Sequence, residues 1–249
     1  MIVLYTDFGV ADPYVGQMHA VLAREAPGVP VVDLLHAVPG FDIRAGAYLL
    51  PALAVEFPPD SIFIGVVDPG VGSGRRPVLV RADERWYIGP DNGLFHMIER
   101  RATQRVETRI IQWRPQRLSI SFHGRDLFAP VAARLAAGKP PNSVPGELTT
   151  PPGNWPDDLP AVIYIDHYGN ATTGLRASQV DRKATLVVAG RQLSYAPVFS
   201  SVGSGEAFWY ENANGLVEVA VNQGSAMEVL GLYLGDEIVI IAESPQGTR

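Results

Sequence analysis

The feature that most constrains the fold is an alternation of strand-like and helix-like stretches over the first 140 residues. Short apolar runs such as Ile2–Tyr5 and Ile62–Val67 have the length and residue types of buried strands. Tyr14–Ala26 places apolar residues at helical spacing, and Asp42 can cap a helix over about Ile43–Phe57. This alternation predicts an α/β fold with an N-terminal, mainly parallel sheet that is flanked by helices on both faces.

Later stretches of the same region continue the pattern. Val78–Ala82 and Trp86–Gly89 predict a β-hairpin with Asp83–Arg85 at its tip. Asp126 is a candidate N-cap for a helix over Leu127–Ala137. We therefore assign residues 1–140 to one α/β domain.

A change of composition separates this region from the rest of the chain. Seven prolines lie between residues 140 and 160, which predicts a proline-rich linker over residues 141–160. Beyond it, short β-rich segments alternate with glycine-containing turns, so residues 161–249 are predicted to form a small β-barrel domain. The predicted strands of that domain are Ala161–Ile165, Thr185–Val188, Phe208–Glu211, Leu216–Val221 and Glu237–Ala242.

Composition narrows the class of function. The formal net charge of −6 argues against a general binder of nucleic acid or of anionic membranes. The chain has no cysteine, which excludes disulfides, thiolate metal sites and a cysteine nucleophile. No apolar run approaches the length of a membrane span and no signal-like segment opens the sequence, so we expect a cytoplasmic protein.

A charged, glycine-rich loop follows the predicted strand Ile62–Val67. It carries one carboxylate, Asp68, and two guanidiniums, Arg75 and Arg76, among three glycines. Ligands of open α/β sheets bind at the carboxyl ends of strands, so Asp68 and Arg75 are candidate site residues. Two alternatives are a hairpin connection with a salt bridge and a phosphate cradle, although a phosphate cradle requires a helix at this point.

Two further motifs place polar side chains at the ends of predicted elements. Asp7 follows the first strand, where a carboxylate can accept two hydrogen bonds from a ribose diol. Asp7 and Asp12 could instead join Asp33 and His36 at a divalent metal, although the spacing matches no metal motif. His123 precedes a predicted helix and is placed like a site residue, with a structural role as the alternative.

A third motif opens the predicted barrel. Tyr168 lies between Asp166 and Asn170, so an aromatic ring that could stack on a base is flanked by hydrogen-bonding side chains. The amide of Asn170 offers both a donor and an acceptor, which suits adenine. The alternative is a tight turn at Gly169.

Together these motifs resemble one family, the S-adenosyl-L-methionine hydroxide adenosyltransferases, which are related to fluorinase and chlorinase. The resemblance is collinear over nearly the whole chain, and six short motifs in one order make it specific. In chain order they are Thr6-Asp7-Phe8-Gly9, Asp33-Leu34-Leu35-His36, Asp68-Pro69-Gly70-Val71-Gly72, Pro90 with Asn92-Gly93-Leu94, Phe122-His123-Gly124-Arg125-Asp126 and Asp166 with Tyr168-Gly169-Asn170.

The resemblance implies an enzyme that uses water or hydroxide to displace methionine from C5′ of S-adenosyl-L-methionine, giving adenosine and L-methionine. It implies no metal and no organic cofactor, and a homotrimer whose sites lie between the N-terminal domain of one subunit and the C-terminal domain of a neighbour. Two alternatives stay open: a chlorinase-like halogenase that uses the same substrate, and a non-catalytic sensor of S-adenosyl-L-methionine or adenosine.

Residue roles follow from the same resemblance. A carboxylate stands at position 68 where the halogenases carry a tyrosine, which favours water over halide as the nucleophile. The implied catalytic residues are Asp68, Arg75 and His123. The implied substrate-binding residues are Asp7 at the ribose, Asp12, Tyr14 and Asp166 at the methionine end, Phe41, Tyr168 and Phe199 as apolar walls, and Asn170 at the adenine.

Overall fold

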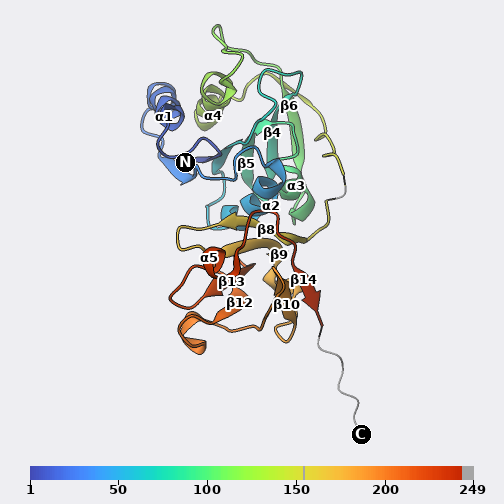
Figure 1. Ribbon diagram of the computed structural model, residues 1–249. Helices are drawn as coiled ribbons and strands as arrows, with labels where there is room; N and C mark the ends of the chain where they lie inside the picture. The colour runs from blue at the N-terminus through green and yellow to red at the C-terminus, as the bar shows by residue number, and fades with distance from the viewer. Residues whose placement is uncertain (154, 243–249) are drawn as a thin grey trace. The chain divides into compact units, whose positions relative to one another are not determined.

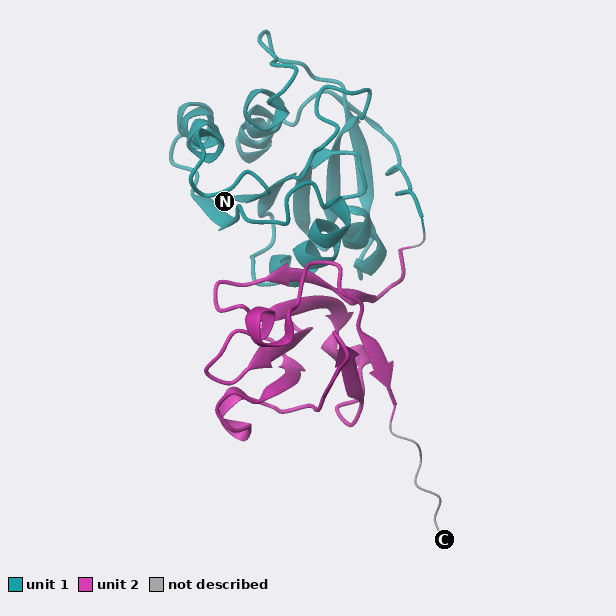
Figure 2. Ribbon diagram, viewed as in Figure 1, with its two compact units in different colours: residues 1–153 teal, residues 154–249 magenta. Residues whose placement is uncertain are grey.

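The computed structural model describes residues 1–153 and 155–242 of the chain. The chain divides into two compact units, residues 1–153 and residues 154–249, which Figure 2 draws in teal and magenta. None of the helices in the described residues combines the length and the apolar character that a membrane span requires.

The first unit is built on a seven-stranded sheet with helices on both faces (Figure 1). Its elements are β1 (Ile2–Thr6), α1 (Pro13–Glu25), β2 (Val31–Leu35), α2 (Ile43–Ala54), β3 (Ile62–Val66), β4 (Pro77–Ala82), β5 (Arg85–Pro90), α3 (His96–Arg101), β6 (Glu107–Ile111), α4 (Ala129–Ala136) and β7 (Ser143–Pro145). The strand order is β2-β1-β3-β5-β4-β6-β7. Strands β2, β1, β3 and β5 are parallel, whereas β4 pairs antiparallel with both β5 and β6. The expected mainly parallel α/β arrangement is confirmed.

The alternation of side chains along the strands separates the two helical layers. In β1, Ile2 and Leu4 pack into one apolar core with α1 and α4. Val3 and Tyr5 point to the opposite face and pack with α2 and α3. All four side chains are fully buried, and burial of such a side chain contributes roughly 1.5–3 kcal/mol. Figure 1 shows α1 beside α4, and α2 beside α3.

The strand order reverses at β1. The connection through α1 leads from β1 to β2 on one side, while the connection through α2 leads to β3 on the other side of β1. The carboxyl ends of β1 and β3 therefore form a topological switch point, where ligands of open α/β sheets bind. Asp7 follows β1 directly, and Asp68 lies two residues beyond the end of β3.

Two local predictions are confirmed in detail. Helix α2 begins at Ile43, and the Asp42 side chain accepts a hydrogen bond from the backbone N–H of Ala45 at 2.8 Å. Strands β4 and β5 form the expected hairpin. Its turn consists of Asp83 and Glu84, which both have positive φ angles, as the right-handed twist of a two-residue hairpin requires.

The predicted cap at Asp126 is wrong. Gly124–Phe128 form a π-helical turn, η1, which continues directly into α4. The Asp126 carboxylate lies inside this turn, where it accepts a hydrogen bond from the Ser119 backbone N–H at 2.8 Å. A capping aspartate and an aspartate within such a turn both precede an apolar run, so the local pattern does not distinguish them.

The stretch predicted as a linker, residues 141–160, is not irregular throughout. Its residues 143–145 form the edge strand β7 of the first unit's sheet, where Pro145 is tolerated because an edge strand needs no further donor on its outer side. Thr149 donates to the Asp91 carboxylate through its backbone N–H and its hydroxyl, at 2.9 and 2.8 Å. The chain beyond β7 is thereby held to the first unit.

The second unit consists of two antiparallel sheets. Its elements are β8 (Leu159–Ile165), β9 (Ala171–Arg176), β10 (Thr185–Val188), β11 (Arg191–Leu193), β12 (Ala207–Glu211), β13 (Leu216–Val221), α5 (Ala226–Leu230) and β14 (Val239–Ile241). The sheets have the orders β12-β13-β9-β8 and β11-β10-β14. Backbone bonds join their edges: Val162 N–H donates to Asp236 at 2.9 Å, and Ala196 N–H donates to Trp209 at 3.0 Å. The region predicted as a small β-barrel thus contains two antiparallel sheets, and no closed barrel is found among its described residues.

The sequence pattern does not predict β9, because Thr172 and Thr173 interrupt its apolar character. Both threonines are buried. The Thr172 hydroxyl donates to Glu218 at 2.7 Å, and the Thr173 hydroxyl donates to the backbone oxygen of Val217 at 2.9 Å. Hydrogen bonds to the neighbouring strand β13 thus allow polar side chains inside the core.

Candidate active site

A cavity of about 420 Å³ lies at the switch point of the first unit. Residues from β3, from the start of α1 and from the segments that follow β1, β2 and β6 line it. Five of the residues singled out from the sequence are among them: Asp7, Tyr14, Phe41, Asp68 and His123.

Arg75 joins the two other members of the predicted catalytic group. Its Nε lies 2.9 Å from both carboxylate oxygens of Asp68, and its Nη2 also bonds that carboxylate. The same Nη2 lies 2.8 Å from Nδ1 of His123. The side chains of Arg75 and Asp68 are only 8% and 5% exposed, so little water screens their attraction. The guanidinium also lies over the ring of Phe128, 5.5 Å from its centroid.

The contact with Arg75 fixes the protonation state of His123. A guanidinium only donates hydrogen bonds, so Nδ1 of His123 must be the acceptor. An imidazole with an accepting Nδ1 is neutral and carries its proton on Nε2. Burial of the ring and, second, the charge of Arg75 lower the pKa of His123, which favours the same neutral form.

Asp7 faces the cavity beside a strained backbone. Phe41 has a φ of 64°, a left-handed conformation that is unfavourable for a bulky residue, and its N–H donates to Asp7 at 3.0 Å. Burial raises the pKa of the Asp7 carboxyl, and the charge of Asp68 acts in the same direction. Strain of this kind gathers at functional sites, where the surrounding structure maintains it. Phe41 is 79% exposed and lines the cavity.

An aromatic cluster forms another wall. The ring centroids of Phe8, Tyr14 and Phe122 lie 5.3 to 5.7 Å apart. Sequence reasoning missed Phe8 and Phe122 as site residues, although each belongs to one of the six motifs and directly adjoins a predicted site residue. Asp12 is not among the residues that line this cavity. It occupies the N-cap position of α1 with an extended backbone, and its side chain makes no capping hydrogen bond.

The remaining predicted residues gather at a second cavity, within the second unit. Its volume is about 600 Å³, and Asp166, Tyr168, Asn170 and Phe199 line it. The predicted substrate-binding residues therefore form two groups, one in each unit.

The turn that carries three of these residues is organised by Asp166. One oxygen of its carboxylate accepts from the backbone N–H groups of Tyr168 and Asn170, both at 2.9 Å, and the other accepts from the Asn170 side chain at 3.0 Å. Gly169 has a φ of 82°, and a Cβ there would lie 2.1 Å from the hydroxyl of Ser225. The tight turn foreseen as an alternative is present, and it leaves Tyr168 75% exposed.

Sequence reasoning also missed a polar group at this cavity. Glu218 is 6% exposed and accepts hydrogen bonds from Thr172, from Asn212 at 2.8 Å and from the hydroxyl of Tyr210. Burial and the hydrogen bond to Glu218 raise the pKa of Tyr210. The available signal is a single glutamate in the otherwise apolar segment Leu216–Val221, because a buried carboxylate requires partners.

The alternative of a divalent metal site that includes Asp33 and His36 is not supported by the described residues. In residues 1–153 and 155–242, no three His, Cys, Asp or Glu side chains are grouped so that they could hold a metal ion. Asp33 instead lies 2.8 Å from Nε2 of His19 and 3.0 Å from Nε2 of His36. Nδ1 of His36 is 2.8 Å from the hydroxyl of Thr6, which places this chain of contacts at the ends of β1 and β2.

Comparisons with protein families cover most of the chain. Residues 2–145 match the model of the SAM hydroxide adenosyltransferase N-terminal domain, and residues 160–239 match that of the C-terminal domain. A protein named (R)-S-adenosyl-L-methionine hydrolase from Thermus thermophilus is 41% identical, over 92% of this chain and 95% of its own. One of the same name from Salinispora arenicola is 39% identical, over 95% and 96%. A fluorinase from Actinopolyspora mzabensis is 27% identical, over 90% and 91%.

Solved structures have the same fold. The crystal structure of an uncharacterized conserved protein from Thermotoga maritima superimposes with a TM-score of 0.84 at 31% identity, over 97% of this chain and all of that one. A conserved hypothetical protein from Thermus thermophilus gives a TM-score of 0.76 at 38% identity, over 96% and 99%.

Proposed function

The chain belongs to the S-adenosyl-L-methionine hydroxide adenosyltransferase family, and on that premise we propose that it hydrolyses S-adenosyl-L-methionine to adenosine and L-methionine. The contact of Arg75 with both Asp68 and His123 is the observation that carries the proposal. It joins a carboxylate, a guanidinium and a neutral imidazole beside a cavity at the switch point. The relatives at 39–41% identity, which are named as hydrolases of this substrate, support the same reaction.

The reaction is a displacement at carbon. The oxygen of water forms a bond to C5′ of the adenosyl group while the bond from C5′ to sulfur breaks. Its electron pair stays on sulfur, so the sulfonium leaves as the neutral thioether of methionine and needs no proton. One proton must be removed from the attacking water, and that is the main chemical task of the protein.

Asp68, Arg75 and His123 divide that task. Since Nδ1 of His123 accepts from Arg75, Nε2 carries the proton and donates a hydrogen bond to the attacking water. The water oxygen keeps its other lone pair for the attack on C5′. Asp68 accepts the proton, since the imidazole has no free acceptor nitrogen in this arrangement. The Arg75 charge favours the anionic form of the nucleophile. Positioning of reactants contributes on the order of 7–11 kcal/mol, and a placed base contributes about 10²–10⁴-fold in rate.

The two groups of binding residues divide the substrate between them. In the first unit, Asp7 binds the ribose diol, Phe41 covers the ring, and Asp12 and Tyr14 bind the methionine end. Residues of the second unit complete the site: Asp166 at the methionine end, Tyr168 and Phe199 as apolar walls, and Asn170 at the adenine. We include in the proposal a homotrimer in which each site combines the first unit of one subunit with the second unit of a neighbour. A cytoplasmic location stays a prediction from the sequence.

The configuration at sulfur is part of the proposed specificity. The sulfonium sulfur carries three different substituents and a lone pair, so the substrate exists as two epimers. The relatives' name specifies the (R) form, and we propose the same preference here. Separate assays of the two epimers test it, and equal values of kcat/KM for both would refute it.

The test of function is a product assay. Purified protein should convert S-adenosyl-L-methionine into equal amounts of adenosine and methionine, measured by chromatography against a sample without enzyme. In ¹⁸O-labelled water, the label should enter O5′ of adenosine. Asp68→Ala and His123→Ala should each lower kcat about 10²–10⁴-fold, as expected for loss of a proton-handling group. Unlabelled adenosine, or unchanged turnover in both variants, would contradict the mechanism.

The same assay separates the alternatives. A halogenase would produce 5′-halo-5′-deoxyadenosine when chloride or fluoride is added, whereas the hydrolase should give adenosine with or without halide. A sensor would bind the substrate saturably in calorimetry and release no product at high protein concentration. Asp68 favours the hydrolase over the halogenase, because a buried carboxylate repels a halide.

A further inference from the structure

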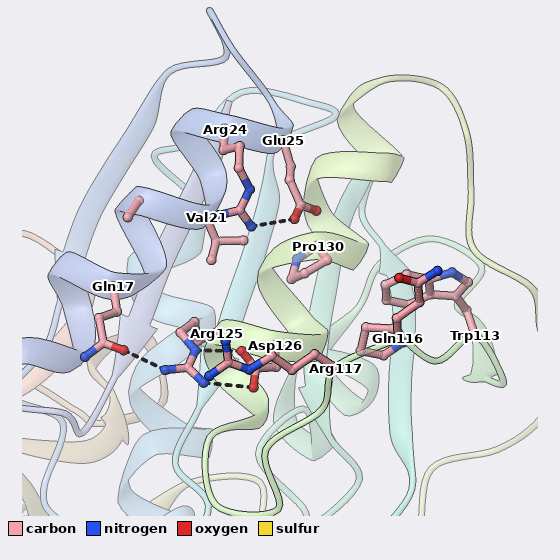
Figure 3. Close-up of a pocket in the computed structure, with 12 residues that line it drawn as sticks. Gln17, Val21, Arg24, Glu25, Trp113, Gln116, Arg117, Arg125, Asp126 and Pro130 are labelled. Carbon is pink, nitrogen blue, oxygen red and sulfur yellow. Dashed lines mark hydrogen bonds and ion pairs between the residues drawn. The ribbon is translucent and has the colours of Figure 1, made fainter.

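A second cleft of the first unit lies between α1, α4 and the segment that follows β6. Its volume is about 520 Å³, and three guanidiniums reach it, those of Arg24, Arg117 and Arg125 (Figure 3). Arg24 lies 2.8 Å from Glu25, and Arg125 lies 2.6 Å from Asp126. Most of the charge in this cleft is thus satisfied by neighbouring side chains, which indicates a structural network rather than a ligand site.

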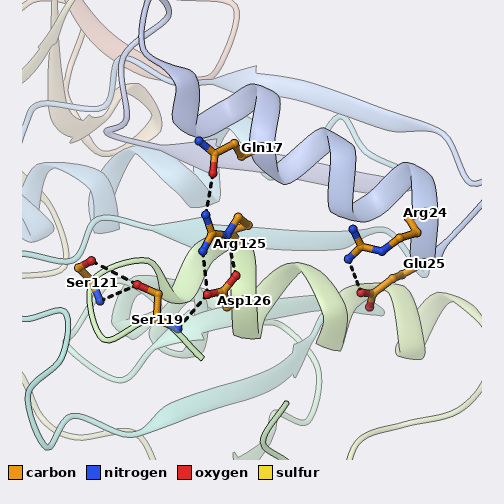
Figure 4. A network of polar contacts seen from close by, with 7 residues as sticks. All are labelled: Gln17, Arg24, Glu25, Ser119, Ser121, Arg125 and Asp126. Carbon is orange, nitrogen blue, oxygen red and sulfur yellow. Dashed lines mark hydrogen bonds and ion pairs between the residues drawn. The ribbon is translucent and has the colours of Figure 1, made fainter. Parts of the chain in front are cut away.

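One branch of this network connects two distant segments. Gln17 of α1 accepts from Nη1 of Arg125 at 2.7 Å (Figure 4). Arg125 donates two further hydrogen bonds to the carboxylate of Asp126, from Nε to Oδ1 at 2.6 Å and from Nη2 to Oδ2 at 2.9 Å. Oδ2 of Asp126 accepts from the Ser119 N–H at 2.8 Å. The Asp126 side chain is 11% exposed, so these bonds are largely protected from water.

The segment held at Ser119 leads into the candidate active site. The Ser119 hydroxyl accepts from the N–H of Ser121 at 3.3 Å, and Ser121 lines the cavity together with His123. The backbone oxygen of Ile120 lies against Gly72, in the loop that carries Asp68 and Arg75. The network therefore ends where the two catalytic segments meet.

We propose that Asp126, which is hydrogen-bonded to Arg125, is a positioning residue. It holds the segment from Ser119 to His123 in the conformation in which His123 contacts Arg75. The proposal rests on the hydrolase function. Asp126 does not line the candidate cavity, and it positions His123 through the backbone that it holds.

The π-helical turn explains why the backbone before it needs the hydrogen bonds of Asp126. His123 directly precedes η1, and a π-helical turn contains more residues than an α-helical turn and is rarely stable by itself. A shift of one residue in helical register would rotate His123 by about 100° away from its contact with Arg75. The bonds of Asp126 to Ser119 and Arg125 oppose that shift.

The charge of Asp126 also reaches the imidazole. The charged groups that influence the pKa of His123 are Arg75, Asp68, Arg114 and Asp126. Burial and the two arginines lower the pKa of His123, whereas the two carboxylates raise it. Loss of the Asp126 charge by itself lowers the pKa of His123, whereas loss of the contact with Arg75 raises it, so the direction of the shift is a readout of positioning that is independent of turnover.

The experiment compares Asp126→Asn with Glu25→Gln. The control removes an equivalent carboxylate from an adjacent Arg–Glu pair in the same cleft, which has no bond to Ser119. Asp126→Asn should lower kcat by about 10–100-fold with little change in KM, as expected from misplacement of a catalytic group. Glu25→Gln should retain the wild-type values. Arg125→Lys retains the positive charge but loses the two parallel N–H donors to Asp126. The kcat of this variant should therefore fall less than that of Asp126→Asn.

Two further measurements keep the outcome interpretable. Thermal unfolding shows whether Asp126→Asn is folded. If it is not folded, Arg125→Lys replaces it in both the kinetic measurement and the His123 titration. NMR titration of His123 without substrate, assigned by comparison with His123→Ala, should give a higher pKa in Asp126→Asn than in wild type, because displacement from Arg75 outweighs loss of the weaker Asp126 charge effect. A folded Asp126→Asn with wild-type kcat, or with a His123 pKa equal to or below that of wild type, would overturn the proposal. If wild-type protein shows no turnover, the hydrolase function fails, and the titration alone still decides whether Asp126 positions His123.

Discussion

Arg75 is the residue on which the candidate site depends. Its planar guanidinium donates to both oxygens of Asp68 and, from the same Nη2, to His123. A lysine ammonium carries the same charge but lacks this fixed fork, so it cannot reproduce both contacts in one geometry. Arg75 therefore orients both partners: it pairs with the carboxylate of Asp68 and holds His123 as a neutral donor through Nε2.

The protonation state of His123 leads to a prediction for activity. Protonation would break the contact with Arg75, and burial together with the Arg75 charge lowers the pKa of His123 below its ordinary value of 6.5. We expect kcat to stay constant as the pH falls through 6.5 and to decline only at lower pH. A plot of log kcat against pH checks this, and an acid limb centred at or above 6.5 would contradict it.

The same shift has a defined effect on stability. The unfolded chain begins to bind a proton at His123 near pH 6.5. The folded chain binds this proton only at lower pH, because the pKa of His123 is lowered in the folded state. The free energy of unfolding should therefore decrease as the pH falls from about 6.5 towards the lowered pKa, and this contribution should be fully present above 6.5. Denaturant titrations at several pH values would measure it, with His123→Ala as the variant in which this contribution disappears.

At the scale of elements, the loop between β3 and β4 depends on one backbone position. Gly72 has a φ of 82°, and a Cβ there would lie 2.7 Å from the backbone oxygen of Ile120. Gly72→Ala should cost about 1–3 kcal/mol from backbone strain, with a fall in Tm of about 2–4 °C per kcal/mol for a chain of this size. Since the loop carries Asp68 and Arg75, kcat should also fall.

Gly74 in the same loop provides the matched control. A Cβ at Gly74 meets nothing within 4 Å, and its φ lies outside the left-handed range. Gly74→Ala should therefore leave Tm nearly unchanged. If both variants lowered Tm equally, flexibility of the loop in general, and not the close approach at Gly72, would be the cause.

The N-termini of α1 and α2 differ in a way that separates stability from binding. Asp42 caps α2 with a bond to Ala45, so Asp42→Ala should cost about 0.5–2 kcal/mol. Asp12 stands at the cap position of α1 without such a bond. Asp12→Ala should leave the free energy of unfolding almost unchanged and raise KM, as its proposed contact with the methionine end requires. Equal destabilisation of both variants would show that Asp12 has a capping role.

At the scale of the whole molecule, the proposed substrate contacts belong to two units. The catalytic contact lies within residues 1–153, and the exposed ring of Tyr168 lies in the second unit. If each site combines halves from two subunits, the defects of Asp68→Ala and Tyr168→Ala can complement each other. In an equal mixture, about a quarter of the interfaces would combine two unmodified halves.

Co-expression of the two variants tests this arrangement. The co-expressed sample as a whole should recover about a quarter of the wild-type rate at low substrate concentration, while each variant alone stays below it. Analytical ultracentrifugation of the same samples gives the oligomeric state. A site within one subunit predicts no recovery beyond the average of the two variants.

The sequence by itself determined the alternation of strands and helices, the cap at Asp42, the β4–β5 hairpin and the positions of the polar motifs at element ends. These features depend on neighbours within a few residues, and periodicity, capping residues and turn residues record them directly. For the same reason, the sequence placed Asp68 and Asp7 correctly after buried strands.

Only the tertiary structure decided which of these residues meet. Arg75 and His123 are 48 positions apart, and their contact depends on the π-helical turn and on the packing of Gly72 against Ile120. Strand β9 and the polar network at Glu218 likewise exist because hydrogen bonds from distant segments compensate their burial. Local patterns record which side chains are to be buried, whereas the partner of each buried polar group is fixed only when the chain packs.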